Sequence, residues 1–188
     1  MLEQLLEAKG VSVQHAGGDF GGGQCGDTRL GLVCTNTSGP GYLNTPGTFD
    51  LIHFNYGLHD LANYSAALPR LPLPQYEANL QAIYARLQSR SKLVMWTSTT
   101  PAPNVTQPFG RSFQIVKTYN EHALSALTSV ATGGKLLIND LWTAMVDHCG
   151  YEYTKCDLQL PENVHLTPAG IDFTAASAAK DILAALGM

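Results

Sequence analysis

Two residues near the carboxyl end of the chain could form part of a catalytic site. His165 lies in the segment LPENVHLTPAG, and Glu162 stands three residues before it. A carboxylate bound to one imidazole nitrogen fixes the tautomer of a histidine and leaves the other nitrogen free to act as a general base. The pair taken alone also fits an ordinary loop histidine beside a surface glutamate, and this alternative stays open.

A second polar pair follows an apolar stretch, FDLIHFNYGLHDL, in residues 49–61. This stretch predicts a buried strand that ends in a turn at Gly57, with His59 and Asp60 directly after it. Asp60 could simply cap the following turn, and His59 could simply pack against the core. His53 lies inside the strand, where a hydrogen-bonded core histidine is the better interpretation.

A glycine-rich loop, GGDFGGGQCGD, contains the spacing Gly-x-Gly-x-x-Gly at Gly21, Gly23 and Gly26. Dinucleotide-binding turns share this spacing, but here no long helix follows and no acidic residue ends the next strand. A flexible loop whose N–H groups could serve an anionic intermediate is the preferred interpretation. Neither Cys-x-x-Cys nor His-Glu-x-x-His occurs, so no metal and no cofactor are expected.

Composition narrows the class of protein. The chain has 188 residues, 45% of them hydrophobic and 14% charged, with a net charge of −4. These values indicate a globular protein, and we expect one domain over residues 1–188. Lys and Arg are too few and too scattered to follow a phosphate backbone, so nucleic acid is not an expected partner. No apolar stretch approaches the roughly 20 residues of a membrane span.

Apolar periodicity predicts helices and strands that alternate along the chain. Helices are expected over residues 2–9, 75–90, 112–130 and 168–186, and strands over 11–16, 50–55, 92–97 and 135–138. This alternation is typical of an α/β fold with a mostly parallel sheet. Because functional residues gather at the carboxyl ends of parallel strands, the loops after the strands should meet at one edge of the sheet.

Several segments together resemble the SGNH hydrolases, also called GDSL-type esterases. They are CGDTRLGL, FDLIHFNYGLHDL, TSTTPAP, INDLW and LPENVHLTPAG, with Tyr119–Asn120 between them. The likeness is greatest to a subgroup with Gly-Leu-His-Asp after the third strand. It implies a flavodoxin-like three-layer α/β/α fold and hydrolysis of carboxylic esters without a cofactor. The implied partner is a small acylated substrate, either a carbohydrate or a short-chain ester.

The resemblance also implies roles for residues of two loops. Gly26 matches the glycine whose backbone N–H lines the oxyanion hole. Gly57 and Asp60 match the ends of the Gly-x-Asn-Asp motif and would support it. His59 stands where most members have the asparagine that donates to the oxyanion, and a neutral imidazole can donate one N–H in its place.

By the same resemblance, His165 matches the catalytic base and Glu162 the acid of the triad. The Gly-Asp-Ser motif that supplies the nucleophile is absent from the sequence, and Ser98 is not a convincing substitute. We therefore expect that roughly 15–25 residues, one strand and its turn, are missing before Met1. The chain as given would be nearly inactive; the alternative is a binding module that keeps the fold and performs no chemistry.

In the family that strand is central, between residues 11–16 and 50–55. The expectation is a gap of about two strand spacings, ~9.6 Å, or direct pairing of the two flanking strands.

Other residues hint at a secretory route. Cys149 and Cys156 flank a short loop that a disulfide could close, although two free thiols remain an alternative. Asn36, Asn63 and Asn104 each begin an Asn-x-Ser/Thr sequon. The chain carries no targeting signal, so secretion is an expectation for a longer form of the protein.

Overall fold

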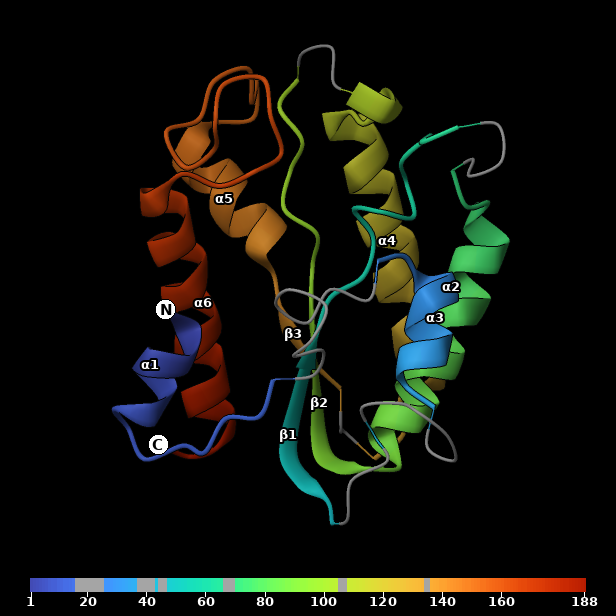
Figure 1. Ribbon diagram of the computed structural model, residues 1–188, viewed down its shortest axis with the longest axis vertical. Coiled ribbons are helices and arrows are strands. Elements are labelled where there is room, and N and C mark those ends of the chain that lie inside the picture. Colours follow the sequence, from blue (N-terminus) through green and yellow to red (C-terminus); the bar gives the residue numbers. More distant parts are fainter. Residues whose placement is uncertain (16–25, 37–42, 44–46, 66–69, 105–107, 134–135) are drawn as a thin grey trace.

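A parallel sheet of three strands lies at the centre of the molecule (Figure 1). The computed structural model describes residues 1–15, 26–36, 43, 47–65, 70–104, 108–133 and 136–188. The strands are β1 (Phe49–Phe54), β2 (Ser91–Thr97) and β3 (Leu136–Asn139), in that spatial order. Leu51 of β1 is opposite Leu93 of β2, and Val94 of β2 is opposite Leu136 of β3.

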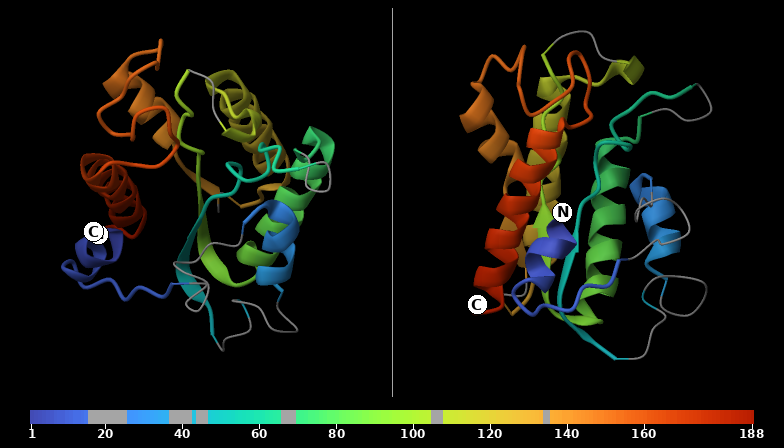
Figure 2. Two further views of the ribbon diagram at one scale, coloured as in Figure 1. Left: turned by 45° about the horizontal axis from the view of Figure 1, so that its top comes forward. Right: turned by 60° about the vertical axis from the view of Figure 1, so that its left-hand side comes forward.

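Helices cover both faces of this sheet (Figures 1 and 2). One layer contains α2 (Thr28–Cys34), α3 (Leu73–Gln88) and α4 (Phe113–Val130). The other contains α1 (Leu2–Glu7) and α6 (Pro168–Ala185), and α5 (Leu141–Cys149) contacts α6 through His148 and Phe173. The predicted α/β fold with a parallel sheet is therefore confirmed. Among the helices of the described ranges, none is long and apolar enough to cross a bilayer.

The main core explains why α3 and α4 were predictable. Tyr76, Leu80 and Ile83 of α3 repeat at helical spacing and are fully buried, as an amphipathic helix requires. They share one apolar cluster with Val94 of β2 and Val116 of α4.

The sequence prediction is wrong for two kinds of element. Residues 11–15 form no strand; Val11 and Val13 instead pack against apolar side chains of α1 and α6. A strand needs a partner for its backbone groups, and the described residues supply none there. Helices α2 and α5 were not predicted, although each begins at an aspartate N-cap, Asp27 and Asp140.

β1 lies at an unpaired edge of the sheet. The N–H of Phe49 donates to the carbonyl oxygen of Arg90 at 2.9 Å, which fixes the side of β1 that faces β2. Because successive peptide groups of a strand point in opposite directions, Asp50, Ile52 and Phe54 direct their N–H and C=O groups away from β2. Within the described ranges, no strand pairs with this side.

A large groove runs along that unpaired edge. Its volume is about 1260 Å³, and residues 11–15 line it opposite β1. Apolar side chains from both ends of the chain contribute to its wall: Leu2, Leu6, Val11, Val13, Ile182 and Leu186. The flanking segments therefore do not pair directly with each other, and no described residue forms a strand between them.

Candidate active site

The loops that carry the predicted site residues gather at the end of the sheet where the strands finish, the upper end in Figure 1. Gly26, Gly57 and His59 all line the groove beside β1. His165 and Glu162 are exposed and precede α6, and neither lines the groove. Gly21 and Gly23 lie outside the described residues. The structure thus places the proposed oxyanion residues on one groove and the proposed base on a separate loop.

Asp60 joins the loop after β1 to the beginning of α2. Its side chain is fully buried, and Oδ1 accepts hydrogen bonds from the backbone N–H and the hydroxyl of Thr28, at 2.9 and 2.6 Å. The Thr28 hydroxyl in turn accepts from Asn79 Nδ2 at 3.0 Å. Because Thr28 lies two residues after Gly26, this network fixes the start of α2 relative to His59.

The second oxygen of Asp60, Oδ2, has no hydrogen-bond partner among the described residues. Burial raises the pKa of Asp60 to about 6, although the two hydrogen bonds from Thr28 oppose the shift. A buried carboxylate with one unpaired oxygen is stabilised by protonation. The loop is therefore held by a group whose charge changes near neutral pH.

Gly57 has the backbone conformation that the turn after β1 requires. Its φ is 154°, and a Cβ atom at this position would lie 2.4 Å from the hydroxyl oxygen of Thr99. A side chain is therefore excluded by both conformation and space. The absence of a side chain lets the loop turn directly from the end of β1 toward His59.

His59 belongs to a polar and aromatic cluster that the sequence analysis did not identify. The Tyr64 hydroxyl lies 2.6 Å from His59 Nδ1, and Arg111 Nη2 donates to the same hydroxyl oxygen at 2.7 Å. Burial and the positive charge of Arg111 lower the pKa of His59, and the negative charge of Asp27 opposes them. His59 is therefore neutral at pH 7 and can donate only one N–H.

His53 of β1 is hydrogen-bonded as predicted, but it is half-buried and lines the groove instead of lying in the core. Its Nε2 lies 2.5 Å from the hydroxyl oxygen of Thr97. Burial lowers the pKa of His53 to about 4, so the ring is neutral at pH 7.

The loop that carries His165 is fixed by backbone pairing. Gln159 and Leu166 form an antiparallel bridge, and the N–H of Leu160 donates to the carbonyl oxygen of His165 at 2.9 Å. Buried Gln159 donates from Nε2 to the carbonyl oxygen of Pro101, after β2, at 2.7 Å. A Cβ atom on Gly170 would lie 1.9 Å from a backbone oxygen of this loop, so the beginning of α6 packs directly on it.

The ring of His165 is bonded to Asn163. Nδ1 lies 2.5 Å from Asn163 Oδ1, which also accepts the backbone N–H of His165 at 3.1 Å. Glu162 makes no hydrogen bond to the ring in the described part of the chain, and it has a left-handed backbone with φ of 51°. An amide oxygen can only accept, so Asn163 leaves the proton on Nδ1 and the lone pair on Nε2. Asn163 stands next to Glu162 in sequence and was overlooked.

Ser98 is a structural residue. Its hydroxyl donates to Asp140 Oδ1 at 2.9 Å and accepts the N–H of Trp142 at 2.8 Å. Both interactions hold the beginning of α5 against the end of β2. This hydroxyl is buried and occupied, which agrees with the expectation that Ser98 is not the nucleophile.

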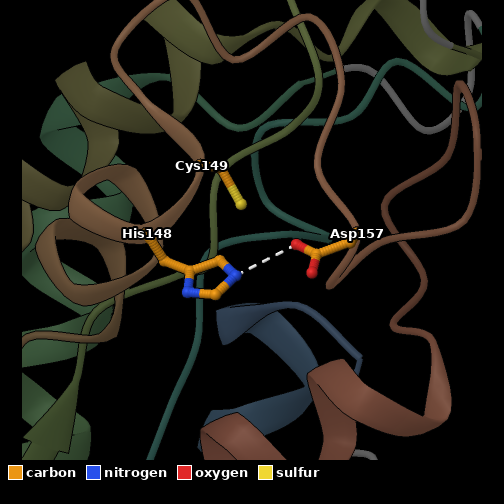
Figure 3. Close-up of side chains that lie close together, drawn as sticks. All are labelled: His148, Cys149 and Asp157. Atoms are coloured by element: carbon orange, nitrogen blue, oxygen red, sulfur yellow. Dashed lines mark hydrogen bonds and ion pairs between the residues drawn. The ribbon is translucent and has the colours of Figure 1, made fainter.

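One cluster of possible metal ligands occurs in the described residues, formed by His148, Cys149 and Asp157 (Figure 3). His148 Nε2 lies 3.0 Å from Asp157 Oδ1, so the two form a direct pair. Cys149 is bonded to Cys156 in a disulfide, the pairing considered from the sequence. A disulfide sulfur lacks the thiolate charge that binds zinc, so only two conventional ligands remain.

Two of the sequon asparagines are exposed. They are Asn63 and Asn104; Asn63 accepts the N–H of Arg70 through Oδ1 at 2.8 Å. Asn36 is half-buried. Modification of these three residues stays a prediction.

Solved structures share this fold although sequence comparison finds no relative. Neither a family model nor a curated protein matches the chain. A GDSL-like lipase from Bacteroides thetaiotaomicron superposes with a TM-score of 0.68 at 16% identity, over 97% of this chain and 80% of that one. A candidate acylhydrolase from Bacteroides fragilis gives 0.66 at 16% identity, over 95% and 77%.

A third similar structure is a salicylyl-acyltransferase from a tetracycline biosynthetic pathway. It gives a TM-score of 0.60 at 18% identity, over 100% of this chain and 49% of that one. At these identities the likeness establishes a fold of the GDSL type for this chain.

The titration of Asp60 should be measurable in the stability of the protein. A carboxyl whose pKa is higher in the folded state binds more protons when folded, so stability falls as pH rises from about 4 to about 6, by on the order of 3 kcal/mol. Asp60→Asn should flatten this fall, measured by urea unfolding at several pH values. Exposed Asp50 on β1 supplies a matched control, Asp50→Asn. An unchanged pH dependence in Asp60→Asn would contradict the assignment.

Proposed function

We propose that this chain forms the scaffold of a carboxylic ester hydrolase that acts by serine acyl transfer. The observation that carries the proposal is the groove along the unpaired edge of β1, which Gly26 and His59 both line. A fold of the GDSL type supports it. In this proposal an additional strand, ending in a Gly-Asp-Ser turn, pairs with β1 and delivers the nucleophile beside these residues.

His165 is the proposed general base. Its Nε2 has no hydrogen-bond partner among the described residues, whereas Nδ1 is held by Asn163. Nε2 removes the serine proton as the hydroxyl oxygen attacks the ester carbonyl, and then gives that proton to the departing alcohol. Water then hydrolyses the acyl-enzyme with the same base. In this proposal the loop that carries His165 lies beside the added strand.

The oxyanion of the tetrahedral intermediate is the second part of the proposal. Backbone N–H of Gly26 and Nε2–H of His59 donate to it, each donor typically being worth ~3 kcal/mol. Asp27, next to Gly26, is negative, but its charge is neutralised by the ion pair with Arg29. Burial opposes the ionisation of Asp27, yet the hydrogen bond from Arg29 holds its pKa below the usual value.

The substrate and location follow from the same proposal. A small acylated carbohydrate or short-chain ester suits a site formed by polar loops at the end of the sheet. The disulfide between Cys149 and Cys156 and the exposed sequons at Asn63 and Asn104 favour a secreted protein.

The alternative function is a binding module without catalysis. It is favoured by one observation: Ser98, the serine that follows β2, is fully engaged in structural hydrogen bonds. In that case the groove and the loops around it would bind a ligand and leave it unchanged.

Supplying the strand should create activity. The extended protein carries an apolar strand ending in Gly-Asp-Ser before residue 1, where α1 already lines the groove. This extended protein should hydrolyse p-nitrophenyl acetate, whereas the 188-residue chain should not. Replacing the added serine by alanine, or His165→Ala, should lower kcat by about 10³-fold or more. Serine-dependent turnover by the 188-residue chain alone would contradict the proposal, and a folded but inactive extended chain would favour the binding module.

The residue that orients His165 can be identified in the same active chain. The structure favours Asn163, so Asn163→Ala should lower kcat by about 10-fold or more with little change in KM, because the ring loses its fixed tautomer. Glu162→Gln, which preserves size but removes the charge, should have a smaller effect. The reverse order of effects would assign the orienting role to Glu162, as the sequence predicts.

A further inference from the structure

The ring of His59 has a hydrogen-bond environment that selects one of its two neutral tautomers. Arg111 Nη2 can only donate, so the Tyr64 hydroxyl oxygen accepts from it at 2.7 Å. The single hydroxyl proton of Tyr64 is then free to point at His59 Nδ1, 2.6 Å away. If Nδ1 carried a proton instead, the hydroxyl proton would have no acceptor in this cluster.

We propose that Tyr64 and Arg111 are positioning residues that keep His59 as the Nε2–H tautomer. This inference rests on the proposed function, in which Nε2–H donates to the oxyanion. Without a fixed tautomer, part of the protein population would present a lone pair to the developing negative charge. Two contacts outside the groove would thus determine whether His59 can replace an asparagine side chain.

Arg111 is held rigidly enough for this role. Its side chain is buried, and Nε donates to the carbonyl oxygen of Leu58, the residue before His59, at 3.2 Å. The guanidinium also lies over the rings of Tyr64 and Phe109, at 5.6 and 5.5 Å from their centroids. Planar hydrogen bonding combined with stacking is a geometry that lysine cannot reproduce.

The charge of Arg111 acts in the same direction. In the described part of the chain, Arg111 forms no ion pair with a carboxylate, so no neighbouring carboxylate neutralises its positive charge beside His59. Two charged groups act on His59: Arg111 lowers the pKa of the ring, and Asp27 raises it. The ring therefore stays neutral, which the single-donor role requires.

The tautomer can be tested directly by nitrogen NMR of ¹⁵N-histidine-labelled protein, with His59→Gln used to assign the ring. The unaltered chain should show a protonated Nε2 and an unprotonated Nδ1. Tyr64→Phe removes only the hydroxyl and should give a mixture of tautomers; exposed Tyr151, changed by Tyr151→Phe, is the matched control. A protonated Nδ1 in the unaltered chain, or an unchanged ring in Tyr64→Phe, would overturn the proposal.

Substitutions at Arg111 distinguish the effect of its charge on the pKa of His59 from the effect of its hydrogen bond on the tautomer. Arg111→Gln should raise the pKa of His59 because the nearby positive charge is lost, whereas Arg111→Lys should keep it low and still disturb the tautomer. In the extended, active chain, Tyr64→Phe should lower kcat about fivefold to tenfold with little change in KM, as expected for one hydrogen bond. The NMR result does not require activity, so failure of this inference and failure of the proposed function can be told apart.

Discussion

The unpaired backbone edge of β1 is the constraint on which the rest of this structure depends. In a three-layer α/β fold the sheet is covered on both faces, so its backbone groups are satisfied by neighbouring strands. On one side of β1 that neighbour is absent from the described residues, and a groove of about 1260 Å³ takes its place. A single added strand would pair the outward N–H and C=O groups of Asp50, Ile52 and Phe54 and cover apolar side chains of α1 and α6. These features are the reason for proposing that the groove receives a strand.

The loops at the end of the sheet where the strands finish are held by hydrogen bonds among the described residues. Asp60 bonds to Thr28, Gln159 bonds to Pro101, and Asn120 forms two hydrogen bonds of 2.9 Å with the backbone of Thr99. Each interaction joins a loop to a different element of the fold. Groups held in this way need little reorganisation during a reaction. In the proposed function, the Asp60–Thr28 hydrogen bonds would therefore hold the loops of Gly26 and His59 in place before a nucleophile is added.

Local sequence patterns predicted most of the fold, and long-range contacts explain the exceptions. Helix α3 was predictable because periodic apolar residues match its buried face, and strand β2 because its continuous apolar run is buried on both faces of the sheet. Residues 11–15 have the alternation of a strand, but pairing depends on a neighbour that periodicity cannot reveal. Helix α2 is seven residues long, which is too short for a clear periodic signal. Its aspartate N-cap was the one sequence feature that could have indicated it.

The candidate site shows the same division. Gly26, His59 and His165 could be put forward as candidate site residues because a family resemblance matches them by position in sequence, and their roles stay a prediction. The network around His59 could not be predicted, since Arg111 is 52 residues from His59 in sequence and reaches it only through the hydroxyl of Tyr64. Asn163 was missed for a different reason: the neighbouring residue, Glu162, carries a carboxylate, which is the more usual partner of a catalytic histidine. Side-chain geometry decides such cases.

Hydrogen exchange of the β1 amides tests the central claim most directly. A peptide with an apolar strand followed by Gly-Asp-Ser should protect the N–H groups of Ile52 and Phe54, which face the groove, when it is added to the chain. The N–H groups of Leu51 and His53, already paired with β2, should change much less. This alternating protection is the result that strand addition predicts. Equal exchange with and without the peptide, at concentrations where it binds, would contradict the account.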